Sequence, residues 1–144
     1  MKNIVILGAT GSIGTQSLEV IEDNRGFRAF ALSAHSNIAV LETQIRKFRP
    51  KFACVTREDR AAELKIKVAD TDTKVLSGPK GAEELAAHPE ADTVITGIVG
   101  IAGLRPTLAA VEAKKRIGLA NKETLVTAGD LVMERASQTG AQII

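Results

Sequence analysis

The chain has 144 residues, a net charge of +2 and an aromatic share of 3%, with neither Trp nor Tyr. This length suits one domain with its own core, and the weak charge and scarce aromatic rings argue against nucleic-acid binding. A single cysteine, Cys54, excludes an internal disulfide. The sequence has neither a signal-peptide pattern nor an apolar run of about 20 residues, so we expect a cytoplasmic protein that does not span a membrane.

Short apolar runs alternate along the chain with longer amphipathic segments. The expected strands are Asn3–Leu7, Phe27–Ser33, Phe52–Val55, Thr73–Leu76, Thr93–Thr96, Arg116–Leu119 and Ala141–Ile144. The expected helices lie near residues 12–23, 37–48, 57–69, 80–87, 104–115 and 123–138. This alternation predicts an α/β fold whose sheet is mostly parallel, with right-handed crossovers and helices on both faces. The pattern leaves the strand order and the direction of the last strand open.

The first expected helix carries a mostly apolar stripe. Its members are Ile13, Ser17, Val20, Ile21 and Asn24. Because they recur at helical spacing, they support a helix near residues 12–23.

Three glycines at three-residue spacing follow the first expected strand, in Gly8-Ala9-Thr10-Gly11-Ser12-Ile13-Gly14. A turn from a strand into a helix gathers unpaired backbone amides at the positive end of the helix dipole, which makes an anion site. A tight turn that binds nothing is the alternative. Because the loop opens a complete β-α-β unit, the pattern favours dinucleotide binding and a Rossmann-like, doubly wound sheet of about seven strands.

Each residue of this loop has an expected part in binding. Gly8 permits the tight turn, Gly11 removes a Cβ where the diphosphate approaches, and Gly14 lets the helix pack against the strand. Thr10 and Ser12 add hydroxyl donors, and Ser12 is expected to cap the helix.

The end of the second expected strand bears on the choice of cofactor. It reads Leu32-Ser33-Ala34-His35-Ser36-Asn37, without the carboxylate that NAD enzymes place there for the ribose 2′-hydroxyl. Ser36 and Asn37 can donate hydrogen bonds to a 2′-phosphate, and His35 adds charge when protonated. We therefore expect NADP(H). A simple helix cap at Ser36 or Asn37 is the alternative, and it is compatible with this role.

Two later strand ends are unusual. Residues 97–103 again hold three glycines at three-residue spacing, with Gly100 in the middle, which suits either close approach to a ligand or a flexible turn. Asn121, Lys122 and Glu123 follow the sixth expected strand. Lys122 can bind a phosphorylated or carbonyl substrate there, whereas Asn121 as a cap and Glu123 at the helix dipole are the structural alternative.

Other reactive side chains receive no functional assignment. Cys54 lies in an apolar run and is expected to be a buried structural thiol. The basic clusters at 46–49 and 114–116 are expected to be solvated and to complement helix C-termini. Two histidines without a cysteine–histidine cluster give no soft-metal site.

Three segments together resemble the 1-deoxy-D-xylulose 5-phosphate reductoisomerase family. They are residues 8–14, residues 98–108 (Ile-Val-Gly-Ile-Ala-Gly-Leu-Arg-Pro-Thr-Leu) and residues 120–129 (Ala-Asn-Lys-Glu-Thr-Leu-Val-Thr-Ala-Gly). The Asn-Lys-Glu segment is the most specific, and the similarity covers essentially the whole chain in order. The chain also stops inside an apolar, strand-like run, which is typical of a domain from a longer protein, although a buried terminal strand also fits.

The resemblance implies an activity for the full-length protein. The family rearranges 1-deoxy-D-xylulose 5-phosphate and reduces the resulting aldehyde with NADPH to 2-C-methyl-D-erythritol 4-phosphate, in non-mevalonate isoprenoid biosynthesis, with Mg or Mn as the metal. Its members are homodimers of three-part subunits, and residues 1–144 match only the NADPH-binding part. The metal carboxylates, the lid and the phosphate-binding residues lie beyond residue 144. We therefore expect no catalytic or metal-binding residue in this chain, and no activity from it alone.

The resemblance also implies roles for individual residues. Thr10, Gly11, Ser12 and Ile13 match the family's contacts to the cofactor phosphates. Residues His35, Ser36 and Asn37 fall on the 2′-phosphate segment, where relatives commonly have Gly and Lys, so this chain departs from the family there. Asn121 and Glu123 match cofactor-side residues, and Lys122 matches a substrate contact.

Three rival functions compete with this interpretation. Short-chain dehydrogenases and nucleotide-sugar epimerases open with a similar loop, but their catalytic Tyr is missing from this tyrosine-free chain. The N-terminal domains of aspartate-semialdehyde and homoserine dehydrogenases share the architecture, but the Asn-Lys-Glu segment argues against them. A non-catalytic NADP(H)-sensing module is the third. The full-length reading frame distinguishes it, because an acidic, metal-binding continuation marks an enzyme.

Overall fold

The computed structural model describes residues 2–97, 104–119 and 142–143. The strands are β1 (Lys2–Leu7), β2 (Phe27–Ala34), β3 (Phe52–Val55), β4 (Lys74–Ser77), β5 (Thr93–Thr96), β6 (Arg116–Leu119) and β7 (Gln142–Ile143). The helices are α1 (Ser12–Glu22), α2 (Ile38–Phe48), α3 (Glu58–Lys67), α4 (Gly78–Ala86) and α5 (Leu104–Glu112). All these elements were expected from the sequence, within a few residues at their ends. The helix expected at 123–138 falls outside the described residues.

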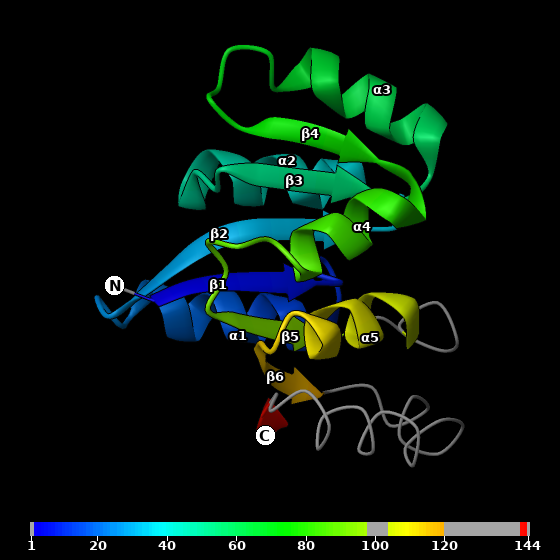
Figure 1. Ribbon diagram of the computed structural model, residues 1–144. Helices are drawn as coiled ribbons and strands as arrows, with labels where there is room; N and C mark the ends of the chain where they lie inside the picture. The colour runs from blue at the N-terminus through cyan, green and yellow to red at the C-terminus, as the bar shows by residue number, and fades with distance from the viewer. Residues whose placement is uncertain (1, 98–103, 120–141, 144) are drawn as a thin grey trace.

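The described strands form one seven-stranded sheet in the order β4-β3-β2-β1-β5-β6-β7. Every neighbouring pair is parallel, including β6 with β7, so the last strand runs parallel to its neighbour. Figure 1 shows the strand arrows pointing the same way, so the carboxyl ends of the strands lie along one edge of the sheet. The predicted α/β, doubly wound fold is confirmed.

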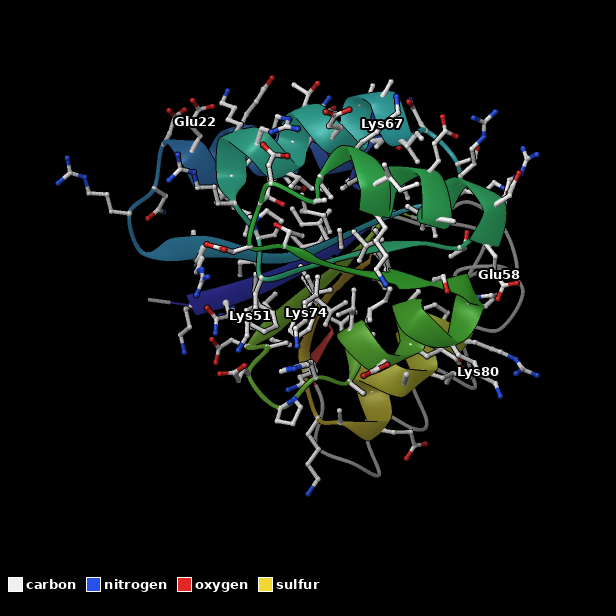
Figure 2. All side chains as sticks on the ribbon, turned by 90° about the horizontal axis from the view of Figure 1, so that it is seen from above. Glu22, Lys51, Glu58, Lys67, Lys74 and Lys80 are labelled. Atoms are coloured by element: carbon white, nitrogen blue, oxygen red, sulfur yellow. The ribbon has the colours of Figure 1, made fainter. Side chains whose placement is uncertain are left out.

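Helices cover the sheet in two layers, each with its own core. On one face α1, α2 and α3 pack on a cluster that includes Ile6, Leu32 and Leu64. On the other face α4 and α5 pack on a cluster that includes Leu7, Leu85 and Val111. Figure 2 shows the two layers on opposite sides of the strands. Right-handed crossovers produce this division, because the chain steps from β1 toward β4 on one face and returns through β5 and β6 on the other.

Local sequence signals explain how the helices begin and end. Asn37 caps α2, because its side-chain oxygen accepts a hydrogen bond from the amide of Val40 at 3.3 Å. The first turn of α3 is acidic and its last turn is basic, which complements the helix dipole. Charged side chains point outward around the molecule (Figure 2), with Glu58 and Lys80 toward the carboxyl ends of the strands and Lys51 and Lys74 toward the opposite end.

The helix that the apolar stripe supports is present as α1, but only part of the stripe is buried. Val20 is 60% exposed and Ile13 is 41% exposed, whereas Gly14, Leu18 and Ile21 are the buried residues of α1. The helix turns this face inward because Gly14, which has no side chain, lets it approach the loop after β1. Apolar periodicity gives no weight to a glycine, so the apolar residues at helical spacing do not all lie on the buried face of α1.

The basic cluster at 114–116 is also not simply solvated. Lys115 is buried, and its ammonium group donates a hydrogen bond to the carbonyl of Ala91 at 2.6 Å. Desolvation lowers the pKa of Lys115, and the nearby charge of Asp92 opposes this shift. Lys115 therefore joins the end of α5 to the start of β5. At 46–49 the expected complement to a helix end is confirmed, since Arg46 and Lys47 lie in the last turn of α2.

Cys54 lies on β3 and has no exposed surface, as expected. Burial raises the pKa of its thiol to about 12, and the charge of Glu84 contributes to the shift. Among the described helices, none is long and apolar enough to cross a membrane.

Candidate functional site

The loop after β1 stands where the winding of the sheet reverses. The last residue of β1, Leu7, pairs with Ser33 of β2 on one side and with Thr96 of β5 on the other. The two crossovers that leave these strands run over opposite faces of the sheet, so this point of the carboxyl edge is a topological switch point. Ligands of doubly wound sheets bind at such a switch point.

Two features fix the beginning of this loop. Gly8 has a φ of 80°, a backbone conformation that favours glycine. The amides of Gly8 and Ala9 both donate to the carbonyl of Ser33, at 3.1 and 2.8 Å, and the Ser33 hydroxyl accepts from Gly8 as well. The loop is thus anchored to β2 before it enters α1.

The first amides of α1 remain available to a ligand. The first backbone hydrogen bond of the helix joins the amide of Thr15 to the carbonyl of Gly11 at 2.9 Å. Within the described part of the chain, the amides of Ser12, Ile13 and Gly14 have no hydrogen-bond partner. They converge at the positive end of the helix dipole, where an anionic group is favoured.

Ser12 does not cap the helix, contrary to expectation. Gly11 occupies the N-cap position, with φ −80° and ψ 178°, and no side chain caps it. Ser12 is instead the first helical residue. The loop therefore leaves the helix start without a side-chain acceptor, which keeps these amides open to an external acceptor.

Gly14 and Gly11 differ in what a side chain would meet. A Cβ on Gly14 would overlap the carbonyl oxygen of Gly8 and would lie 2.7 Å from the carbonyl carbon of Ala9. A Cβ on Gly11 would have its nearest neighbour, the Gly8 oxygen, at 3.6 Å, an ordinary contact. The fold therefore requires glycine at position 14 but not at position 11.

Gln44 of α2 holds the glycine loop through a hydrogen bond, a role that the sequence did not predict. Its side-chain amide donates to the carbonyl of Ala9 at 2.8 Å, and the residue is buried. Its own oxygen has no partner among the described residues. The signal was present in the sequence, because Gln44 sits beside Leu41 and Ile45 on the buried face of an amphipathic helix.

The turn after β2 lies next along the same edge. It contains His35, Ser36 and Asn37, and Asn37 caps α2 as the alternative interpretation supposed. A ring nitrogen of His35, Nδ1, lies 2.8 Å from the hydroxyl of Thr56, which follows β3. The structure thus brings the residues predicted for the 2′-phosphate to the carboxyl edge, beside a threonine that the sequence analysis had not considered.

Several predicted site residues fall outside the described residues. They are Gly100, Asn121, Lys122 and Glu123. Gly97, the first glycine of its segment, is described, and its amide donates to the carbonyl of Leu7 at 2.8 Å. A Cβ on Gly97 would lie 3.7 Å from the Gly8 oxygen, so Gly97 itself lies directly beside the glycine loop.

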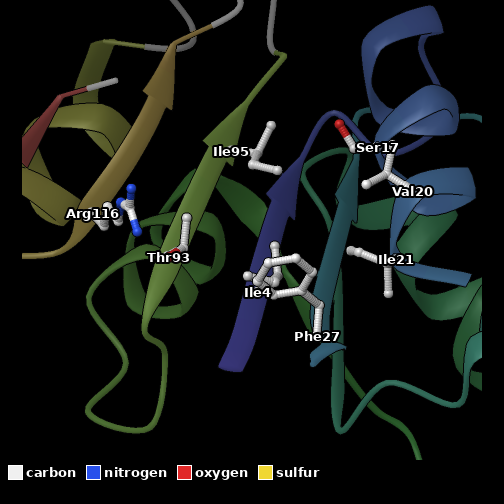
Figure 3. Close-up of a pocket in the computed structure, with 8 residues that line it drawn as sticks. All are labelled: Ile4, Ser17, Val20, Ile21, Phe27, Thr93, Ile95 and Arg116. Carbon is white, nitrogen blue, oxygen red and sulfur yellow. The ribbon is translucent and has the colours of Figure 1, made fainter. Parts of the chain in front are cut away.

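An apolar hollow of about 330 Å³ lies elsewhere, along the side of α1 (Figure 3). It is lined by Ile4, Ser17, Val20, Ile21, Phe27, Thr93, Ile95 and Arg116. None of these residues belongs to the glycine loop or to the turn after β2, and the hollow offers few polar groups. It is not the candidate site.

No group of three His, Cys, Asp or Glu side chains that could hold a metal ion occurs in the described ranges.

Comparison with known proteins identifies the family. The model of the 1-deoxy-D-xylulose 5-phosphate reductoisomerase family matches residues 4–129. The chain belongs to this family. It is 47% identical over 144 residues to the reductoisomerase of Agathobacter rectalis, and 48% identical over 146 residues to the chloroplastic reductoisomerase of Oryza sativa. It covers 38% and 31% of these two proteins, so this reductoisomerase chain spans about a third of the length of the curated relatives it matches.

Solved reductoisomerases share its fold closely. A crystal structure of DOX-P reductoisomerase in complex with NADPH, fosmidomycin and magnesium has a TM-score of 0.95 at 45% identity, over 99% of this chain and 36% of that one. The Zymomonas mobilis reductoisomerase in complex with NADPH has a TM-score of 0.94 at 33% identity, over 99% and 38%. A homoserine dehydrogenase from Thiobacillus denitrificans, at 21% identity and a TM-score of 0.59, shows only the shared Rossmann-like fold.

Proposed function

We propose that residues 1–144 form the NADPH-binding domain of a reductoisomerase that converts 1-deoxy-D-xylulose 5-phosphate to 2-C-methyl-D-erythritol 4-phosphate. The observation that carries the proposal is the glycine loop, whose open amides at Ser12, Ile13 and Gly14 face the switch point of the sheet. The NADPH complexes of two solved relatives support it, since both have the same fold at TM-scores of 0.94 and 0.95.

The residues of the loop fit a dinucleotide diphosphate. Gly8 makes the turn, Gly11 leaves space above the loop, and the first amides of α1 donate to the phosphate oxygens. Thr10 and Ser12 add hydroxyl donors at the same place. A diphosphate held there is positioned by backbone that Ser33 and Gln44 have already fixed, so little ordering remains to be done on binding.

The second subsite distinguishes the two nicotinamide cofactors. The turn at His35, Ser36 and Asn37 has no carboxylate to repel a 2′-phosphate, and its side chains can donate hydrogen bonds to the phosphate oxygens. We infer that NADPH binds more tightly than NADH. The proposal also includes Gly100, Asn121 and Glu123 as cofactor-side residues and Lys122 as a substrate contact, on the basis of the family motifs.

When bound, NADPH supplies the hydride that reduces the rearranged aldehyde. The part of this chain in the reaction is to hold and orient that donor, which lowers the barrier by removing the cost of bringing the reactants together. The phosphorylated sugar and the divalent metal require residues beyond this chain. We therefore propose that the chain alone has no turnover. A homodimer and a cytoplasmic location for the whole protein remain predictions.

Isothermal titration calorimetry of the purified chain tests the proposal directly. NADPH should bind with a clear preference over NADH, and adding substrate with Mg²⁺ should produce no NADPH oxidation. Comparable affinity for the two cofactors would contradict the role proposed for the turn after β2. Turnover by the chain alone would contradict the proposal that catalysis needs residues outside it. Sequencing the reading frame beyond residue 144 distinguishes an enzyme from an NADP(H)-sensing module.

A further inference from the structure

We propose that Thr56 and Arg57, which follow β3, complete the subsite for the 2′-phosphate, with the Arg57 guanidinium as its cation. This inference rests on the proposed cofactor function and adds residues to it. It answers a question left by the turn after β2, where His35, Ser36 and Asn37 include neither Lys nor Arg. A phosphate dianion is held best by a charged donor, and a guanidinium can bind it through two parallel hydrogen bonds.

The pairing of β2 with β3 continues past the ends of both strands. Ala34 pairs with Val55 as the last pair of the ladder. Beyond it, the amide of Thr56 donates to the carbonyl of Ala34 at 3.0 Å, and the amide of Arg57 donates to the carbonyl of His35 at 3.0 Å. The backbone of Arg57 is therefore fixed beside the first residue of the predicted 2′-phosphate segment, although 22 positions separate the two residues in the sequence.

Thr56 fixes the histidine of this segment. Its hydroxyl lies 2.8 Å from Nδ1 of His35, so the imidazole is held against the end of β3. The other ring nitrogen has no hydrogen-bond partner among the residues that the structure describes. Thr56 thus acts as a positioning residue for His35, whose backbone carbonyl accepts the hydrogen bond from the amide of Arg57.

The side chain of Arg57 is prepared to bind an anion. Its Nε donates to a carboxylate oxygen of Asp59 at 2.8 Å, which sets the plane of the guanidinium. Its two terminal nitrogens make no hydrogen bond within residues 2–97, 104–119 and 142–143, and the side chain is 53% exposed. The pair of donors that binds a phosphate in a bidentate manner is therefore free, while Asp59 occupies only the third nitrogen.

The next arginine provides a matched control. Arg60 lies in the first turn of α3, which directly follows the N-cap residue Arg57, has similar exposure, and donates through a terminal nitrogen to Glu63 at 2.9 Å. Within the described residues it makes no hydrogen bond to the turn after β2, and its amide donates to the carbonyl of Arg57. Replacing Arg60 therefore changes the net charge as much as replacing Arg57 does, without removing a donor from the subsite.

The test compares NADPH and NADH binding to the chain and to its Arg57→Gln, Arg57→Lys and Arg60→Gln variants by calorimetry. Arg57→Gln should weaken NADPH binding about tenfold to a hundredfold, the effect of losing one charge-assisted partner, and NADH binding by less than about threefold. Arg57→Lys should recover part of the loss, and Arg60→Gln should bind both cofactors as the parent does. Thr56→Val should reduce the preference for NADPH by a smaller factor.

Each outcome decides the inference. If Arg57→Gln weakens both cofactors equally, Arg57 supports the adenosine or the fold and the 2′-phosphate assignment is wrong. If Arg57→Gln binds both cofactors as tightly as the parent chain does, Arg57 does not belong to the subsite, while the proposed function stands. If the parent chain binds neither cofactor, the proposed function itself fails, which is a distinct result.

Discussion

The two glycines at positions 11 and 14 should separate binding from folding. In Gly11→Ala the new Cβ meets only the Gly8 oxygen, at 3.6 Å, and the backbone already has the extended conformation that any residue adopts. We expect the free energy of unfolding to change by less than about 1 kcal/mol, because weaker N-capping is offset by the lower entropy of the unfolded chain. A substitution at position 11 therefore tests ligand binding without a large effect on the stability of the fold.

Cofactor binding should respond strongly to the same change. A methyl group above the loop keeps the diphosphate from one or two of the open amides, each worth about 1.5–3 kcal/mol when the acceptor is charged. NADPH affinity should fall by at least about tenfold, and Gly11→Val, with a larger side chain, should abolish measurable binding while the circular dichroism spectrum is kept. Titration calorimetry and thermal unfolding on the same preparations make the comparison.

Gly14→Ala should show the opposite pattern. Its Cβ would lie 2.7 Å from the Ala9 carbonyl carbon, so α1 or the loop must shift, and such overpacking costs about 1–3 kcal/mol. For a domain of this size the midpoint of thermal unfolding should fall by roughly 3–12 °C. The reasoning is refuted if Gly11→Ala binds NADPH like the parent, or if it unfolds as readily as Gly14→Ala does.

Three further predictions concern other residues. Gln44→Leu removes the donor to Ala9, so NADPH affinity should fall severalfold in calorimetry, while stability changes little because the unpaired Gln44 oxygen is removed too. Cys54, buried and with its pKa raised to about 12, should resist a thiol reagent at neutral pH until the chain unfolds; rapid labelling of the native protein would contradict this. The hydrogen bond from Arg46 lowers the pKa of Asp70, so the stability that this pair contributes is present above the ordinary carboxyl pKa and is lost as the pH falls through the lowered value. Asp70→Asn should therefore destabilise the chain at neutral pH and lose its effect in acid, as followed by denaturant unfolding.

The sequence predicts the fold well because its local signals agree with one another. Apolar runs of four to eight residues mark buried parallel strands, and glycine ends the first of them at Gly8. The exception is α1, whose buried face depends on how closely Gly14 approaches the neighbouring loop. That distance is a property of the packed structure, and hydrophobic periodicity does not contain it.

The site was only partly predictable for a related reason. Contacts within one segment, such as the Asn37 cap, follow from spacing along the chain. The hydrogen bond from Gln44 to Ala9 and the contact of His35 with Thr56 join residues 35 and 21 positions apart, so they depend on strand order and register. Lys115 shows the same limit, since a charge run that is expected to be solvated places one ammonium group against the carbonyl of Ala91, 24 positions earlier and just before β5.

One strand, β2, sets the distance between the two proposed subsites for the cofactor, the glycine loop and the turn that follows β2. Ser33 holds the glycine loop, and only two residues later the chain reaches His35, roughly 7 Å along at the rise of a strand. In the proposed complex, the loop contacts the diphosphate that NADH and NADPH share, whereas the turn contacts the 2′-phosphate that only NADPH has. The preference for NADPH over NADH can therefore change through substitutions in the turn that follows Ala34, without a change in the strand that anchors the loop.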